Sequence, residues 1–171
     1  MQLIKGEKSE GGSRHGNPLN ETPDDALTFV VFSTAGETFA INVAEVKEII
    51  RVPAITWVPG SRDPVRGVIN LRGSVVPVID LAGALLLASG EKGPEARVLI
   101  VERKGDVIGF LVERVMEVAE ISASAIEPSL RTLGDNEKKM VCSQTTHRKA
   151  LIGILDMESV SDAAQALQGA S

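Results

Sequence analysis

Few side chains in this chain of 171 residues could act as a nucleophile or a base, because it has one cysteine and two histidines. A hydrolase would need Cys142 with His147 as nucleophile and base, or His147 with Asp156 as base and orienting group. Cys142 and His147 stand five residues apart, a spacing that neither guarantees nor forbids contact. His147 lies in a polar stretch, and HExxH, GxxxxGK[ST] and GxSxG motifs are missing. A hydrolase is therefore the weaker alternative.

Two charged residues of the first half, Arg72 and Glu48, could pair with each other at the surface. Arg72 precedes Gly73 at an expected hairpin turn, and its planar guanidinium could be oriented by the Glu48 carboxylate. The plainer alternative is that Arg72 is an ordinary solvated turn residue beside a glycine that supplies positive φ. Glu48 could equally be a surface charge paired with Arg51.

Short runs rich in valine and isoleucine, separated by glycine, proline and charged residues, predict the strands of small β-barrels or sandwiches. The expected strands are 28–33, 38–43, 54–58, 65–71, 75–81, 97–103, 107–112, 141–145 and 151–157. Between the second and third, residues 44–50 predict a short helix, since apolar residues recur at helical spacing and Asn42 with Glu45 resembles a capping box.

An internal repeat is the most informative feature. Residues 36–49 align without gaps to residues 105–118, at an offset of 69, and residues 71–81 match 147–157 at an offset of 76. Each unit alone would have a marginal core, so we expect the two to bury a common face and leave a groove between them. Binding sites often lie in such grooves between subdomains.

The alignment also assigns counterparts to individual residues. Glu117 corresponds to Glu48, and Arg148 corresponds to Arg72, while Lys149 replaces the turn glycine. Asp80 and Asp156 occupy equivalent strand ends, where a carboxylate that caps the following turn is more common than a general base. The divergence at the turn predicts that the two halves do not bind one partner in the same way.

Composition narrows the class of protein. The 18 basic and 23 acidic residues give a formal charge of -5 without a basic stripe, and aromatic residues are scarce, which argues against nucleic acid as a partner. The longest apolar run, 81–88, is far shorter than the roughly 20 residues of a membrane span. With no signal-peptide pattern and a single cysteine, we expect a soluble cytoplasmic protein that does not insert into membranes.

The chain is expected to form one domain between two tails. Residues 1–26 are polar and predict a flexible tail, residues 27–163 the domain, and residues 164–171 a C-terminal tail. We expect the domain to divide into subdomains at about 27–90 and 91–163.

Residues 65–81, with the sequence VRGVINLRGSVVPVIDL, together with the preceding VKEI at 46–49, resemble the CheW-like coupling proteins of bacterial chemotaxis. The similarity runs from about Leu27 to about Val160. It implies two small SH3-like five-stranded β-barrels in a pseudo-twofold arrangement, with short helices. It further implies a non-enzymatic adaptor, without cofactor or metal, at membrane-associated receptor arrays, for flagellar chemotaxis or alternatively for a pilus or other output.

The implied partners are the cytoplasmic tip of a chemoreceptor, of the methyl-accepting kind, and the regulatory domain of a CheA-type histidine kinase. The implied receptor-binding residues, which would line the groove, are Val46, Glu48, Ile49, Arg72 and Val118. Leu130 is the implied kinase-binding residue. Residues 134–149 are more polar than the family pattern.

Overall fold

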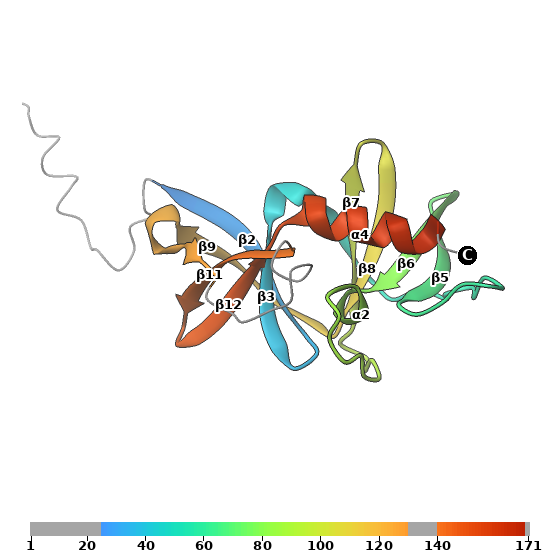
Figure 1. Ribbon diagram of the computed structural model, residues 1–171, viewed down its shortest axis with the longest axis horizontal. Coiled ribbons are helices and arrows are strands. Elements are labelled where there is room, and N and C mark those ends of the chain that lie inside the picture. Colours follow the sequence, from blue (N-terminus) through green and yellow to red (C-terminus); the bar gives the residue numbers. More distant parts are fainter. Residues whose placement is uncertain (1–24, 130–139, 170–171) are drawn as a thin grey trace, which may run out of the picture.

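The computed structural model describes residues 25–129 and 140–169, which form two β-sheets side by side in an elongated molecule (Figure 1). Most of the expected N-terminal tail, residues 1–24, lies outside the described residues, and Ala26 already belongs to the first strand. The predicted mostly β fold with two small barrels is confirmed.

The first sheet has the strand order β10-β11-β12-β3-β2-β9. Its strands are β2 (Ala26–Thr34), β3 (Glu37–Asn42), β9 (Arg114–Ser122), β10 (Glu127–Pro128), β11 (Val141–His147) and β12 (Ala150–Leu155). The two-residue β10 makes this sheet six-stranded, and only the β12–β3 pair within it is parallel.

The second sheet has the order β4-β7-β8-β6-β5. Its strands are β4 (Val46–Arg51), β5 (Val65–Leu71), β6 (Ser74–Asp80), β7 (Arg97–Arg103) and β8 (Asp106–Val112). The helical elements are the 3-10 turns η2 (Val43–Glu45) and η3 (Ala123–Ala125), and the helices α2 (Leu81–Ala84) and α4 (Met157–Gly169). No helix in the described ranges is long and apolar enough to cross a membrane.

The duplication is intertwined. The hairpin β2–β3 of the first copy lies in the sheet otherwise built from the second copy, and the hairpin β7–β8 lies in the sheet otherwise built from the first. The expected division into 27–90 and 91–163 is therefore wrong for the two sheets, because edge strands β4 and β9 each pair with the hairpin of the other copy.

Four equivalent hairpin turns confirm that the two copies share one local geometry. Both central residues of each turn have positive φ, as a type I′ turn requires. These pairs are Ala35 and Gly36, Lys104 and Gly105, Arg72 and Gly73, and Arg148 and Lys149. The last pair lacks glycine, so the second copy holds Lys149 at φ 68° in a region that side chains disfavour.

Apolar side chains form three cores, one for each sheet and one at the junction. The core of the first sheet includes Phe29, Val31 and Ile152, and that of the second includes Val98, Ile100 and Val76, which are their repeat equivalents. The junction core combines Phe32, Phe39 and Ile41 of the first sheet with Ile79, Leu99 and Phe110 of the second, and with Leu81, Val160 and Ala164 of the helices. The expected internal interface between two units is thus present.

Three expected elements differ from the structure. The predicted helix at 44–50 is a single 3-10 turn followed by β4, because Asn42 caps only that turn, through a 2.9 Å bond from the Ala44 N–H, and the β-branched residues that follow pair with β7. Residues 54–58 make one isolated bridge, Thr56 with Val68, rather than a strand. The expected C-terminal tail from residue 164 continues α4, which buries Ala164 against the junction core.

Candidate partner-binding site

Glu48 and Arg72 join opposite edges of the second sheet. Glu48 lies on edge strand β4, and Arg72 occupies the turn between β5 and β6 at the other edge. Arg72 donates from Nη1 to Glu48 Oε2 at 2.7 Å and from Nη2 to Glu48 Oε1 at 2.6 Å, a bidentate pair. The predicted orientation of Arg72 by Glu48 is therefore present, and it takes the place of the alternative pair with Arg51.

The electrostatics of this pair favour a persistent charge pair at the surface. Hydrogen bonds from Arg72 hold the pKa of the Glu48 carboxyl below its ordinary value, and the same bonds raise the pKa of Arg72. The Arg72 side chain is 70% exposed and that of Glu48 is 24% exposed. The guanidinium is thus fixed in direction yet open to a partner.

The apolar members of the expected site lie on two different edge strands. Ile49 is 38% exposed on β4, whereas Val46 is half-buried against the junction core. Val118 is 58% exposed on β9, the edge strand of the first sheet. Val46 therefore serves packing, and Ile49 and Val118 are free to meet a partner. Leu130 lies outside the described residues.

A second ion pair repeats the first on the other barrel. Arg148 Nη2 lies 3.5 Å from Glu117 Oε1, and His147 Nε2 lies 3.5 Å from Glu117 Oε2. Glu117 and Arg148 are the counterparts of Glu48 and Arg72, so the alignment of the repeats held the signal for this second pair. The second pair is longer and has a histidine beside it where the first copy has Leu71.

Two exposed apolar residues near the turns were not anticipated. Val75 and Leu151 are equivalent positions, each three residues after the turn arginine, and both are exposed. Side chains alternate between the two faces of a strand, and the next residue in β6 and β12, Val76 or Ile152, is buried. This alternation could have predicted that Val75 and Leu151 are exposed.

The residues considered for hydrolysis are held apart. Cys142 and His147 lie on one extended strand, β11, where five residues span roughly 16 Å. The Cys142 thiol donates to the Ile154 carbonyl at 3.7 Å, and Asp156 accepts from the Glu158 N–H and the Ser159 hydroxyl. Neither proposed pair, Cys142 with His147 or His147 with Asp156, is assembled.

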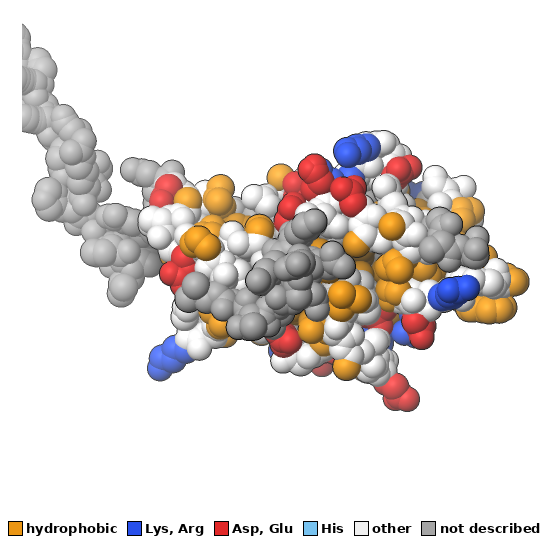
Figure 2. Space-filling view, viewed as in Figure 1, with side chains coloured by type: hydrophobic (Ala, Val, Ile, Leu, Met, Phe, Trp, Pro, Cys, Tyr) orange, Lys and Arg blue, Asp and Glu red, His pale blue; other side chains and the backbone are white. Residues whose placement is uncertain are grey.

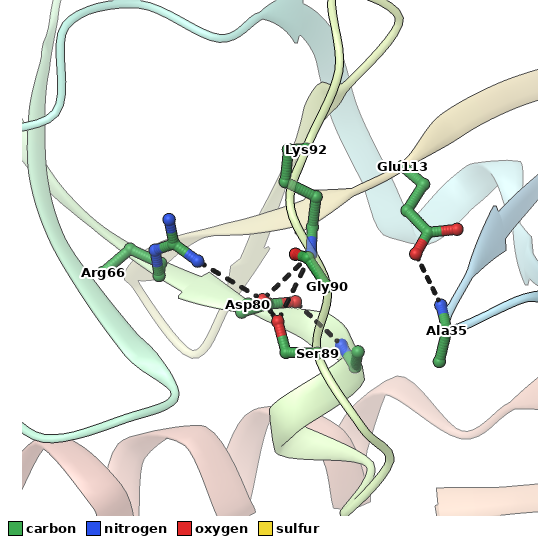
Figure 3. Close-up of polar contacts among 8 residues, drawn as sticks. Ala35, Arg66, Asp80, Ser89, Gly90, Lys92 and Glu113 are labelled. Atoms are coloured by element: carbon green, nitrogen blue, oxygen red, sulfur yellow. Dashed lines mark hydrogen bonds and ion pairs between the residues drawn. The ribbon is translucent and has the colours of Figure 1, made fainter.

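The strand-end aspartates cap turns, as the repeat predicts. Asp80 is buried, and its Oδ1 accepts from the Ala82 N–H at 3.1 Å (Figure 3). Its Oδ2 accepts from Lys92 Nζ at 3.0 Å and from the Ser89 hydroxyl, with Arg66 at 3.6 Å. Asp156 accepts from the Glu158 N–H at 3.2 Å. Across 25–129 and 140–169, no group of three or more His, Cys, Asp or Glu residues could hold a metal ion.

Comparison with known proteins identifies the family. Residues 28–165 match the CheW-like domain. The chain belongs to the CheW-like family. The chemotaxis protein CheW of Helicobacter pylori is 33% identical over 116 residues, which cover 68% of this chain and 70% of that protein. The chemotaxis protein CheW of Bacillus subtilis is 32% identical over 133 residues, which cover 78% and 85%.

Solved structures and a further relative agree with this CheW-like assignment. The crystal structure of the scaffolding protein TtCheW from Thermoanaerobacter tengcongensis aligns with a TM-score of 0.70 and 30% identity, covering 77% of this chain and 89% of that one. The protein PilI of Pseudomonas aeruginosa is 28% identical over 118 residues, which cover 69% of this chain and 66% of PilI.

Proposed function

We propose that this CheW-like protein is a non-enzymatic adaptor that couples chemoreceptors to a CheA-type histidine kinase in bacterial chemotaxis. Its relatives are named as chemotaxis and scaffolding proteins, and the family match covers residues 28–165. The separation of Cys142, His147 and Asp156 supports a role in binding rather than catalysis. The protein then acts in the cytoplasm, reaching membrane-associated receptor arrays through its partners.

The observation that carries this proposal is the bidentate Glu48–Arg72 pair, which holds an exposed guanidinium at the turn between β5 and β6. A fixed guanidinium can recognise a hydrogen-bond acceptor on a partner helix, and exposed Ile49 offers an apolar contact on the other face of β4. We assign the receptor tip to this surface, with Glu48 orienting Arg72. Val118 extends the contact from β9, and Val46 anchors β4 by packing against the junction core.

The kinase regulatory domain is assigned to barrel surfaces outside the receptor contact. Leu130 is the residue we propose for that contact. In the sequence, Leu130 follows shortly after β10. An adaptor of this kind acts by holding its two partners in a fixed relative geometry.

The Arg72 assignment is tested by isothermal calorimetry with a receptor cytoplasmic fragment. Changing Arg72→Ala removes a charged hydrogen-bond donor from the interface, so affinity should fall about tenfold to a hundredfold. The duplication supplies a matched control. Arg148→Ala removes the equivalent exposed arginine of the second copy, and receptor affinity should stay within about twofold of the parent.

Two results would reject this assignment. Unchanged receptor binding in Arg72→Ala, with an unaltered circular dichroism spectrum, would show that Arg72 is an ordinary turn residue. Equal losses in Arg72→Ala and Arg148→Ala would show that the two copies do not differ in the way proposed.

An adaptor for a pathway with a pilus or other non-flagellar output remains the alternative. The similarity to the protein named PilI supports it. The two readings share the receptor and kinase contacts and differ in the output that the kinase controls. Deletion of the gene distinguishes the two interpretations. Loss of swimming responses with normal surface motility supports a flagellar output, and the reverse result supports a pilus output.

A further inference from the structure

A groove between α2 and α4 shares no residue with the proposed receptor contact. One wall is α4, through Ala163, Ala166 and Leu167, and the other is formed by α2 and the turn after it, through Ala84 and Leu86. We call it the α2–α4 groove. Its volume of about 1230 Å³ exceeds the roughly 300–1,000 Å³ of most small-molecule pockets. A segment of polypeptide therefore fits it better than a small molecule.

Two features show apolar side chains presented to this groove rather than buried. α4 packs Val160 and Ala164 into the junction core, with Ala163 half-buried against it, and its exposed residues Ala166 and Leu167 line the groove. Leu86 is 62% exposed and holds φ at 62°, a conformation that costs a leucine free energy. In Figure 2, hydrophobic side chains gather in the region of α2 and α4.

Carboxylates surround the apolar lining. Asp63, Glu91 and Asp162 all line the groove and are exposed, and the part of the chain that the structure describes places no lysine or arginine within ion-pair distance of them. The lining cation, Arg66, lies 3.6 Å from buried Asp80, which also binds Lys92 (Figure 3). Among the described residues, the rim of the groove therefore carries unpaired negative charge.

We propose that the α2–α4 groove binds an amphipathic helix of a partner protein, with leucine-type side chains on one face and lysine or arginine beside them. Small Ala163 and Ala166 allow the backbone of such a helix to approach α4 closely. The flanking cations complement Asp63, Glu91 and Asp162, and charge complementarity gives the groove its selectivity. This interaction surface is additional to the proposed adaptor contacts and does not depend on Arg72.

The test uses the full chain and a fluorescent synthetic helix of about 12 residues, carrying leucines on one face and lysines beside them. A second peptide has glutamate in place of every lysine. The lysine peptide should bind in fluorescence anisotropy, with an affinity that falls as salt rises, and the glutamate peptide should bind at least about tenfold more weakly.

Variants locate the binding. Asp162→Lys should weaken the lysine peptide about tenfold, and Ala166→Arg, which fills the groove from an exposed position, should abolish its binding. Glu120→Lys is the matched control, since it makes the same charge change at an exposed position of β9 and should leave binding unchanged.

Several outcomes would overturn the proposal. These are equal binding of both peptides, equal effects of Asp162→Lys and Glu120→Lys, or full binding by Ala166→Arg. Sedimentation equilibrium tests whether a second copy of the chain occupies the groove. A dimer of the parent protein that Ala166→Arg dissociates would show that the occupant is a second copy and not a partner helix. Removal of residues 1–24 tests whether this N-terminal segment of the chain occupies the groove. Peptide binding that appears only after this removal would also overturn the proposal of a partner helix.

Discussion

Arg72 is held by two independent constraints, its place in a type I′ turn and its bidentate bond to Glu48. The turn sets the backbone at φ 50°, and the carboxylate fixes the guanidinium plane. The duplicated pair, Glu117 with Arg148, joins edge strand β9 to the turn between β11 and β12 in the first sheet. We propose that the first copy combines this structural use with recognition of a partner.

The Glu48 carboxyl should titrate below its ordinary pKa when followed by nuclear magnetic resonance of its side-chain carbon. The pair stabilises the fold at pH values above the unfolded pKa of Glu48, and this contribution is lost as the pH falls through the lower folded pKa. In Arg72→Ala the pKa should rise toward its ordinary value. An unchanged pKa in that variant would show that Arg72 does not control the carboxyl.

At the scale of elements, the close approach of residues 52–64 to β5 depends on Gly67. Its φ is 138°, and a Cβ there would lie 2.2 Å from the Thr56 carbonyl oxygen, the atom that accepts the Val68 N–H at 2.9 Å. Only glycine permits this contact. The bridge between Thr56 and Val68 therefore fastens the segment before β5 to the sheet.

Gly67→Ala should lower the free energy of unfolding by about 3 kcal/mol or more, because the new methyl group meets backbone that cannot move cheaply. Gly93→Ala is the control, since its Cβ would meet no atom within 4 Å and its φ is not positive. Urea denaturation compares the two. Similar stabilities for both variants would contradict the close approach.

Strand positions were predictable from the sequence where valine and isoleucine runs are bounded by turn residues, as for β5 and β7. Strand β9 was not predicted, and β4 was assigned to a helix. Both carry apolar residues at spacings that also fit a helix, and they form strands because each pairs with the hairpin of the other copy. The bond between Glu48 and Arg72 was predictable because the family resemblance singled out both residues. The α2–α4 groove was not, because it depends on the path of α4 across the junction.

At the scale of the whole molecule, the exchange of hairpins makes the two barrels one cooperative body. Each barrel contains a hairpin from the other copy, and the junction core takes side chains from both sheets and from α4. Neither barrel can lose its hairpin without exposing that core. Such an arrangement suits a scaffold that must keep its surfaces at fixed relative positions.

Unfolding should therefore be a single transition. Trp57, the one tryptophan, reports on the second barrel by fluorescence, and a dye on exposed Cys142 reports on the first. The two probes should give coincident curves in urea. Separated midpoints would show that the barrels unfold independently.

As an adaptor, the protein should bring a chemoreceptor and a histidine kinase together. The most direct measurement is size-exclusion chromatography of a mixture of three components. These are the protein, a folded receptor cytoplasmic fragment and the regulatory domain of a CheA-type kinase. We predict one complex that contains all three components and requires this protein for its formation. If both partners are folded and no ternary complex forms, the adaptor function is contradicted.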